Sequence, residues 1–240
     1  MNAATPPNIA ATGSPLNRAG HLPQAPTRDE IAGATVAVLK AGSADKADVI
    51  VVDRGDGAVV VKDFAAKPWW GRWLGRLQIA REAAAYRHLD GVEGIPRFLG
   101  RVDALALAVE KIEGEQLAFH PRRLEDGPLF VTRLRALIDR IHERGVAHND
   151  LRGRENVLVN AEGEVVVVDL AGAVRFHPGG IAHRLFFRLV TTADEAAFLK
   201  WKTLLAPAAL TAADRAALAR FRRLRVLWPF NRKRAAGGDA

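Results

Sequence analysis

The 240-residue chain contains no cysteine. This absence excludes a disulfide framework, a zinc site built on thiolates and a cysteine nucleophile, and it fits a reducing compartment such as the cytosol. No apolar run approaches the roughly 20 residues that a membrane-spanning helix requires. The first 20 residues also lack a charged start followed by an apolar block, so we expect no secretory signal. These absences together predict a cytoplasmic protein.

Acidic residues are missing from the segment 215–234, which carries seven arginines and one lysine. The whole chain has a formal net charge of +8. An excess of positive charge favours anionic partners such as a nucleotide, a phospholipid or a nucleic acid. Charge alone does not choose between these three classes.

The first half of the chain is predicted to be rich in strands. Residues 1–28 have many Ala, Pro, Asn and Thr residues without apolar periodicity, which indicates a disordered arm. Three apolar runs then indicate a small antiparallel sheet, and the segment RGDG between the last two is typical of a tight hairpin turn. The predicted elements are strands at 34–40, 48–53 and 58–64, a helix at about 75–90, and strands near 97–102 and 104–112.

The second half is predicted to be mostly helical. Apolar residues recur at helical spacing from Phe130 to Ile141, and Gly145 follows where a helix would end. A hairpin at 157–169 comes next. Two further helices are predicted from capping boxes, in which a threonine precedes an acidic residue by three positions: Thr192 with Glu195, and Thr211 with Asp214. The predicted fold class is therefore α+β.

The segment GVAHNDLRGRENVLVNAEGEVVVVDLAGA is the richest in chemistry. Asp150 directly follows a predicted helix, Asn156 lies six residues further on, and Asp169 ends the predicted hairpin. Phosphoryl transfer requires a carboxylate that orients an attacking hydroxyl and oxygen ligands that hold Mg²⁺ against the phosphates. A hairpin between Asn156 and Asp169 would bring both ligands to one place. His148 is expected to support this loop structurally rather than to act as a base.

This pattern resembles the protein-kinase-like superfamily, whose catalytic loop and metal-binding motif read H-R-D-L-x-x-x-N and D-F-G. Within it, the chain is most similar to the small bacterial RIO-like and lipopolysaccharide-core-kinase-like group. The resemblance covers about residues 34–172 and implies a bilobal fold that binds ATP and Mg²⁺. It divides the chain into an N-terminal lobe with hinge at 29–114 and a minimal, mostly helical C-terminal lobe with a basic tail at 115–240.

The resemblance also implies roles for individual residues. Asp150 would be the catalytic base, and Asn156 and Asp169 would be the Mg²⁺ ligands. Lys62, on the third strand, would bind the α- and β-phosphates, and Glu82, on the following helix, would pair with that lysine. The remaining cofactor contacts would come from the segment EKIEG and from the turn after the first strand: Glu110 and Ile112, with Gly42 and Ser43 at the phosphates.

The chain departs from the family pattern in ways that affect regulation. Asn149 stands where many kinases have the arginine that senses a phosphorylated activation loop, and the segment 170–190 contains no Ser, Thr or Tyr. We therefore expect a constitutively competent protein. The loop from Asp150 to Asn156 is one residue longer than usual, DLA replaces DFG, and neither G-x-G-x-x-G nor A-P-E occurs. Arg152 and Arg154 fill the longer loop, where phosphate or substrate contacts are favoured over simple solvation.

The five tryptophans are interleaved with cations. One interpretation is a membrane-interface surface, with rings at the headgroups and cations on anionic lipid. The other, which we favour, is that the rings pack inside the fold and the cations extend past them. The residues concerned are Trp69, Trp70 and Trp73 near Arg72 and Arg76, Trp201 between Lys200 and Lys202, and Trp228 after several arginines. We expect no nucleic-acid partner, because no recognisable reading element accompanies them.

Three functions remain open from the sequence. The first is a Ser/Thr protein kinase of the minimal RIO-like type, which transfers the γ-phosphate of Mg·ATP to a hydroxyl. The second is a sugar kinase of the lipopolysaccharide core, attached peripherally to the inner membrane. The third, which is disfavoured because Lys62, Asp150 and Asp169 are all present, is a nucleotide-binding scaffold without turnover.

Overall fold

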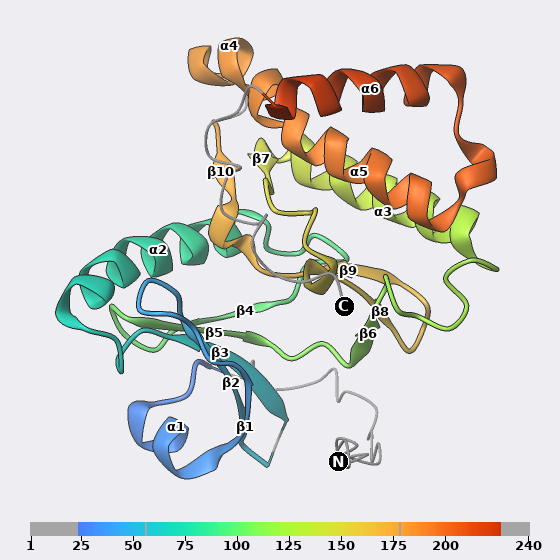
Figure 1. Cartoon of the computed structure of the whole chain (residues 1–240). Coiled ribbons are helices and arrows are strands. Elements are labelled where there is room, and N and C mark those ends of the chain that lie inside the picture. Colours follow the sequence, from blue (N-terminus) through green and yellow to red (C-terminus); the bar gives the residue numbers. More distant parts are fainter. Residues whose placement is uncertain (1–23, 56, 178, 227–240) are drawn as a thin grey trace.

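The computed structural model describes residues 24–55, 57–177 and 179–226 (Figure 1). The predicted arm up to residue 23 and the basic tail from residue 227 lie outside the described residues. The described chain has a first half built on a sheet and a second half built mainly from helices. We refer to residues 24–110 as the sheet half and to residues 114–226 as the helical half.

Five antiparallel strands form the sheet of the first half, and their positions confirm the predicted runs. They are β1 (Thr35–Lys40), β2 (Asp48–Asp53), β3 (Ala58–Asp63), β4 (Phe98–Arg101) and β5 (Ala106–Glu110), in the order β1-β2-β3-β5-β4. Side chains alternate between the faces of a strand. Val59 and Val61 of β3 are buried in one cluster with Ile31, whereas Lys62 lies on the opposite face, toward Glu82 of the following helix.

The predicted disordered arm ends earlier than residue 28. A helix, α1 (Arg28–Ala34), begins at a capping box in which Thr27 and Glu30 bond each other's backbone N–H. Upstream of it, the Ala25 N–H donates to the Leu99 carbonyl at 3.0 Å. Arg28 forms ion pairs with Asp63 and Asp103 on the sheet. Residues 24–28 therefore belong to the sheet half, and the expectation of disorder for them is corrected.

The second helix, α2 (Trp69–His88), begins six residues before the predicted start near residue 75. Two glycines in its first turns lower helix propensity, which is why the sequence pattern placed the start too late. Both glycines are required by packing. A Cβ at Gly75 would lie 2.4 Å from Cγ of Phe64, and one at Gly71 would lie 2.1 Å from the Ala44 carbonyl oxygen. The helix thus approaches β3 and the β1–β2 connection closely through these glycines.

The helical half contains four helices and two small sheets. The helices are α3 (Gly127–Glu143), α4 (Ile181–Val190), α5 (Thr192–Leu205) and α6 (Ala212–Val226). The predicted hairpin is present as β8 (Val157–Asn160) and β9 (Val165–Val167), with β6 (Gly114–Gln116) pairing to β8. A second pair joins β7 (Val146–Ala147) to β10 (Val174–Arg175). Short 3₁₀ turns occur at Arg154–Asn156, Leu170–Gly172 and Pro207–Ala209.

Helix α3 confirms the predicted apolar face, because Phe130, Leu134 and Leu137 are buried with the other residues of that stripe. Gly145 has a φ of 71° just past the helix end, and its N–H donates to the His142 carbonyl. This is the left-handed conformation that glycine adopts with least strain at a helix C-terminus. The predicted end of the helix is therefore confirmed.

Only one of the two predicted capping boxes is present. At α6, the Thr211 side chain accepts the Asp214 N–H and the Asp214 carboxylate accepts the Thr211 N–H. At α5, the prediction is wrong. Thr192 is already helical, and its hydroxyl donates to the Arg188 carbonyl of α4 because α4 leads almost directly into α5. Glu195 pairs instead with Arg135 of α3.

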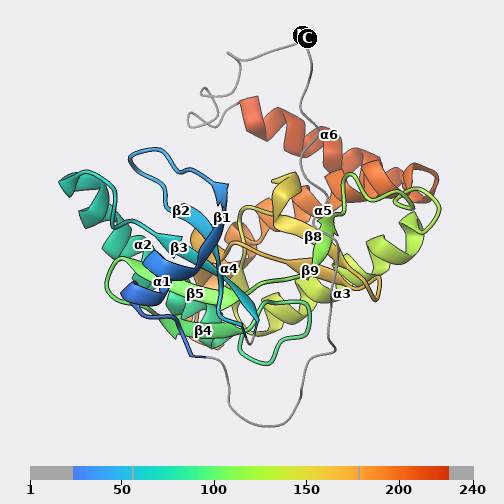
Figure 2. The same ribbon diagram turned by 90° about the horizontal axis from the view of Figure 1, so that it is seen from below.

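The two halves lie side by side (Figure 2). The sheet with α1 and α2 is on one side, and α3, α5 and α6 are on the other. One apolar cluster includes buried residues of both, for example Phe64 and Ile79 with Leu134 and Trp201. The α+β class with a small antiparallel sheet is thus confirmed, and the arrangement is compatible with a bilobal fold. No described helix has the length and apolar character needed to cross a membrane.

Candidate active site

A buried lysine joins the two halves of the molecule. Nζ of Lys62, on β3, donates to Oε1 of Glu82 on α2 at 2.5 Å and to Oδ1 of Asp169 at 2.6 Å. Lys62 and Glu82 are both buried. The predicted pair of Lys62 with Glu82 is therefore present, and Asp169, which follows β9, is brought to the same nitrogen from more than 100 residues away in the chain.

The two carboxylates stabilise the positive charge of the lysine between them. Burial on its own would lower the pKa of Lys62, but the attraction of Glu82 and Asp169 outweighs burial and raises it. Burial would likewise raise the pKa of Asp169, but Lys62 holds it below its usual value. Burial raises the pKa of Glu82 against the attraction of Lys62. The group thus keeps an ammonium ion at a fixed position between the halves.

The turn that carries Asp169 has an unusual backbone. Asp169 has a φ of 66° and a ψ of 78°, in the left-handed region that residues with a Cβ avoid. Its Oδ1 also accepts the Ala171 N–H at 3.2 Å, which starts the turn Leu170–Gly172. Such backbone strain costs about 1–3 kcal/mol and is found preferentially at functional sites. Both contacts use Oδ1, so that Oδ2 is available to a further ligand.

Asp150 and Asn156 form the second part of the site. The side-chain amide of Asn156 donates to the Asp150 carbonyl at 2.8 Å and to the Asp150 carboxylate at 3.1 Å. The longer loop between them is accommodated by the turn Arg154–Asn156, in which Asn156 is buried. The Asp150 side chain reaches the surface but lies beside buried groups. Partial desolvation raises its pKa, although the attraction of His148 acts in the opposite direction. A raised pKa makes this carboxylate a better proton acceptor.

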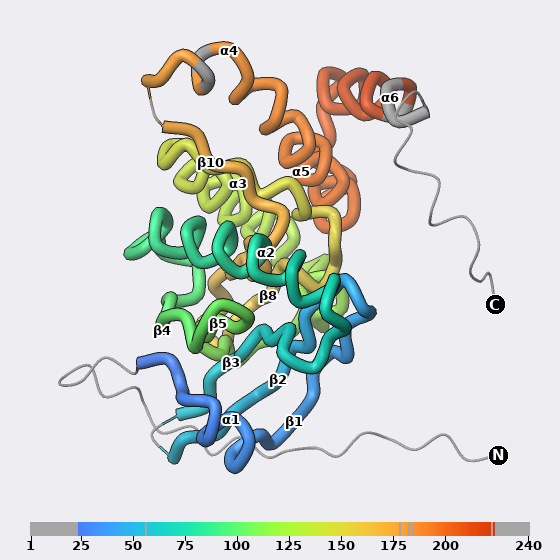
Figure 3. Tube along the Cα trace, turned by 90° about the vertical axis from the view of Figure 1, so that its left-hand side faces the viewer, coloured from blue at the N-terminus to red at the C-terminus, as the bar shows by residue number. Residues whose placement is uncertain are grey.

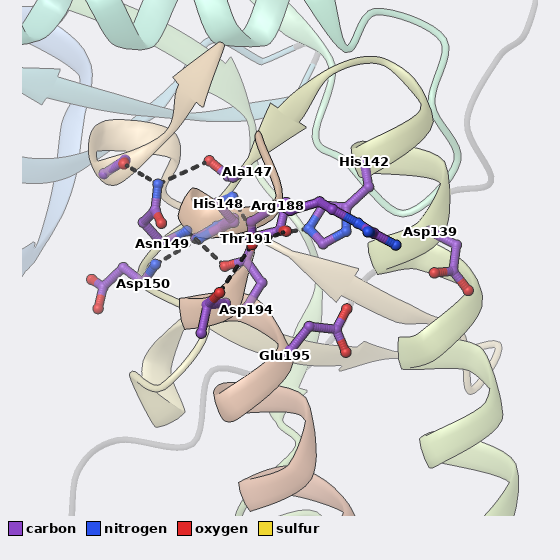
Figure 4. A network of polar contacts seen from close by, with 12 residues as sticks. Asp139, His142, Ala147, His148, Asn149, Asp150, Arg188, Thr191, Asp194 and Glu195 are labelled. Carbon is purple, nitrogen blue, oxygen red and sulfur yellow. Dashed lines mark hydrogen bonds and ion pairs between the residues drawn. The ribbon is translucent and has the colours of Figure 1, made fainter. Parts of the chain in front are cut away.

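The loop that carries Asp150 is held in place by Asp194, a residue that the sequence patterns did not single out (Figure 4). Oδ1 of Asp194 accepts the Asn149 N–H at 2.7 Å, and Oδ2 accepts the His148 N–H at 2.7 Å. Nε2 of His142 lies 3.0 Å from the same Oδ2. Asp194 precedes Glu195 in the segment TADEAAF. No local signal in the sequence distinguishes the acidic side chain that is buried from the one that is exposed.

His148 has the structural role that was expected. It is buried, its Nε2 lies 3.1 Å from the Val168 carbonyl, and its Nδ1 accepts the Asp150 N–H. Burial lowers the pKa of His148, which favours the neutral ring. Below the loop, Nε1 of the buried Trp201 donates to the Leu151 carbonyl at 2.8 Å. The loop that carries Asp150 is therefore fixed from both sides.

Two further groups of predicted residues lie outside this cluster of contacts. Glu110 ends β5, and Ile112 lies in the short connection from β5 to β6, which joins the sheet half to the helical half as expected for a hinge. Gly42 donates its N–H to Asp48 at 2.8 Å, and the Ser43 hydroxyl donates to Asp45 at 2.6 Å. Phosphate binding by Gly42 and Ser43 would require these bonds to open, and it stays a prediction.

A basic groove of about 470 Å³ adjoins the loop that carries Asp150. Arg152 and Arg154 of the loop line it together with Lys200 of α5, and its apolar wall includes Leu218 and Phe221 of α6. Among the described residues, neither of the two arginines forms an ion pair with a carboxylate. The groove therefore offers positive charge next to an apolar wall, and Arg152 in its lining follows Asp150 by two residues.

The donor atoms present fit a magnesium ion held jointly with phosphate. Within the described part of the chain, no group of three or more His, Cys, Asp or Glu side chains is placed to hold a metal by itself. Mg²⁺ commonly uses only one or two carboxylates and completes its octahedron with phosphate oxygens and water. The Asn156 amide oxygen and Oδ2 of Asp169 supply such a partial set.

The fold and the site together define an α+β protein in which a buried Lys–Glu pair meets a partly exposed aspartate beside an Asp–Asn loop. A scan against protein-family models gives no match for this chain, and a search of curated proteins also finds none.

Proposed function

We propose that this protein is an ATP-dependent phosphotransferase with a protein-kinase-like fold. The observation that carries the proposal is the contact of Lys62 with both Glu82 and Asp169. These three residues come from β3, α2 and the turn after β9, in the order that the resemblance to kinases requires. A chance match of sequence motifs would give no reason for three distant ionic groups to meet at one buried nitrogen.

In this proposal, the chain binds the nucleotide between the two halves. Lys62 contacts the α- and β-phosphates, and Glu82 fixes the lysine. The backbone at 110–112 contacts adenine. Asn156 and Asp169 hold Mg²⁺, which, when bound, neutralises charge on the β- and γ-phosphates. Asp150 then faces the acceptor hydroxyl.

The reaction is an in-line transfer. The oxygen of the acceptor hydroxyl forms a bond to the γ-phosphorus as the bond from that phosphorus to the leaving oxygen of ADP breaks. The hydroxyl proton passes to the Asp150 carboxylate, whose raised pKa suits this task. The fixed ammonium of Lys62 and the anchored loop supply position and charge, which account for most of the acceleration in phosphoryl transfer.

The site is also proposed to be active without phosphorylation of its own loop. The Asn149 side chain donates to the Ala147 and Gly172 carbonyls, so it links the catalytic loop to the turn after Asp169. Its N–H is held by Asp194. These contacts take the place of the phosphate-sensing arginine and support the expectation that the protein is constitutively competent.

The acceptor is proposed to be a Ser or Thr hydroxyl of a protein, with a lipopolysaccharide-core sugar as the second candidate. The basic groove beside Asp150 favours the second candidate, because Arg152, Arg154 and Lys200 would bind a negatively charged sugar acceptor. A cytoplasmic enzyme that acts on such an acceptor would work at the inner membrane. The scaffold without turnover stays the least favoured reading.

The first test is the stabilisation of the protein by Mg·ATP, measured as the thermal shift of each variant relative to its own ligand-free state. At about 100 times Kd, binding should add about 2.7 kcal/mol to the free energy of unfolding. We expect Asp169→Asn to lose most of this shift. We expect the same of a double variant, Lys62→Met with Glu82→Gln, in which no buried carboxylate is left unpaired. Asp90→Asn, at an exposed carboxylate in the connection after α2, is the matched control and should keep the shift.

A second measurement separates transfer from binding. Asp150→Asn should keep the Mg·ATP shift but lower transfer of labelled γ-phosphate by about 10²–10⁴-fold. Labelling of added protein would support the first acceptor, and labelling of core sugars the second. A wild-type protein without any metal-dependent shift would contradict the proposed function. A wild-type protein that binds Mg·ATP but labels neither class would instead support the scaffold.

A further inference from the structure

Three of the tryptophans are exposed, contrary to the packing that we favoured. The exposed fractions are 80% for Trp69, 41% for Trp70 and 59% for Trp73. Trp201 is 3% exposed and confirms the packing interpretation for its own position, whereas Trp228 lies outside the described residues. The aromatic residues at the start of α2 therefore form a surface that the rest of the described chain leaves open.

The helix has two distinct faces. Gly71, Gly75 and Ile79 recur every four residues on the buried face. Trp69, Trp73 and Leu77 recur at the same spacing and are all exposed, so they follow one another along the outer face. In Figure 3, α2 lies on the side of the molecule that faces the viewer. We call Trp69, Trp70, Trp73 and Leu77 the α2 aromatic stripe.

The α2 aromatic stripe is flanked by positive charge. Arg72 and Arg76 are exposed and border the stripe on one side, and Arg81 borders it on the other. No acidic residue occurs in the helix between Trp69 and Arg81. Among the described residues, these three arginines form no ion pair. The outer face thus combines indole rings with uncompensated cations.

This combination points to one kind of partner. Indole rings favour the headgroup level of a bilayer, and arginines beside them attract anionic headgroups. A symmetric contact between two copies of the chain would bring the same arginines together and would be opposed by like charges. A protein partner would need its own matching acidic and apolar groups, whereas an anionic phospholipid surface supplies both at once.

We propose that the α2 aromatic stripe, with Arg72, Arg76 and Arg81, docks the protein on an anionic phospholipid surface. Helix α2 lies in the plane of the interface, with its outer face in the headgroup region and its buried face on the sheet. This docking does not depend on the proposed phosphotransfer, because no residue of the stripe belongs to the Lys62 group. It would place the sheet half against the membrane.

The test is co-sedimentation of the full chain with vesicles. One vesicle preparation contains phosphatidylglycerol and phosphatidylcholine in equal parts, and the other contains phosphatidylcholine alone. We expect preferential binding to the anionic vesicles, with a blue shift of tryptophan fluorescence. Trp69→Ser with Trp73→Ser should weaken binding by about tenfold or more, because two rings leave the interface. Arg72→Gln with Arg76→Gln should cost roughly fivefold per arginine at low salt.

The matched control is Leu124→Ser with Leu129→Ser, which changes two exposed apolar residues of the other half and should leave binding unchanged. All these side chains are exposed, so each variant should keep its unfolding temperature. The double variant of Lys62 and Glu82 should still bind vesicles, which separates this proposal from the proposed function. The proposal would be overturned if the tryptophan variant still binds the vesicles as the wild type does. Such binding would indicate that the basic segment 215–234 is sufficient for it. The proposal would also be overturned if the wild type does not bind vesicles but forms a concentration-dependent dimer or a nucleic-acid complex, and if the tryptophan variant loses that dimer or complex.

Discussion

At the scale of single residues, neighbouring acids have very different surroundings. Asp194 is 1% exposed, and its carboxylate accepts hydrogen bonds from two backbone N–H groups and contacts a histidine nitrogen. Glu195 instead forms an ion pair with an arginine near the surface. A buried carboxylate is tolerated only when its oxygens are well bonded. Asp194 meets this condition and, in doing so, sets the backbone of His148 and Asn149. The position of Asp150 follows from that backbone.

Replacement of Asp194 should therefore cost far more than replacement of its neighbour. Asp194→Ala leaves the buried His148 N–H and the partly buried Asn149 N–H without an acceptor, and we expect it to lower the free energy of unfolding by about 3 kcal/mol. Glu195→Ala removes only a partly exposed ion pair and should cost about 0–1 kcal/mol. Urea unfolding of both variants measures the difference. Equal losses would show that Asp194 does not anchor the loop.

At the scale of elements, the helices differ in which groups accept hydrogen bonds from the backbone N–H groups of their first turns. The start of α6 is closed by the reciprocal bonds of Thr211 and Asp214, and α1 starts in the same way at Thr27. The start of α5 has no side-chain cap, because α4 precedes it with little interruption. A capping motif in the sequence is therefore used only where the chain enters the helix from an extended segment.

This difference predicts unequal effects for two similar substitutions. Thr211→Ala should destabilise α6 by about 1 kcal/mol, the usual cost of a lost N-cap. Thr192→Ala should have an effect of no more than about 0.5 kcal/mol, because Thr192 is a partly exposed residue inside a helix and caps no free N–H group. Hydrogen exchange of the amides in the first turns of α6 and α5 measures both effects. The assignment of the cap is wrong if Thr192→Ala proves the more damaging of the two.

At the scale of the whole molecule, the ion pair of Lys62 with Asp169 connects the two halves. Lys62 holds the pKa of Asp169 below its usual value, so the folded state binds a proton at this carboxyl less readily than the unfolded chain does. The stability that this provides is fully present above the unfolded pKa, about 3.9, and is lost as the pH falls through the lower folded pKa.

The pH dependence of stability should reveal this link. We expect Asp169→Asn to have a lower free energy of unfolding than the wild type at neutral pH. This difference in free energy should become smaller as the pH falls below about 4. Urea unfolding at a series of pH values provides the measurement. Asp90→Asn, at an exposed carboxylate in the connection after α2, should show little difference at any pH. A gap for Asp169→Asn that stays constant down to acid pH would contradict the proposed link.

The sequence by itself determined the local elements and the order of the candidate site. Consecutive β-branched residues define β2 and β3, the apolar spacing of α3 defines its buried face, and the box at Thr211 defines the start of α6. Each of these signals lies within a few residues, where backbone period and capping act directly. The predicted pairing of Lys62 with Glu82 came instead from the resemblance to the protein-kinase-like superfamily, which implies that a lysine on the third strand pairs with a glutamate on the following helix.

The tertiary structure alone decided the burial of side chains that no apolar pattern marks. The early start of α2, the inward position of Asp194 and the exposure of Trp69 and Trp73 had no sufficient local signal. Each depends on contacts between distant segments: Gly75 of α2 meets Phe64 of the sheet half, and Asp194 meets a backbone 46 residues earlier. The sequence pattern identifies the buried face of α3, but in α2 the three tryptophans lie outside, and only packing against the rest of the chain selects the glycine-bearing face for burial.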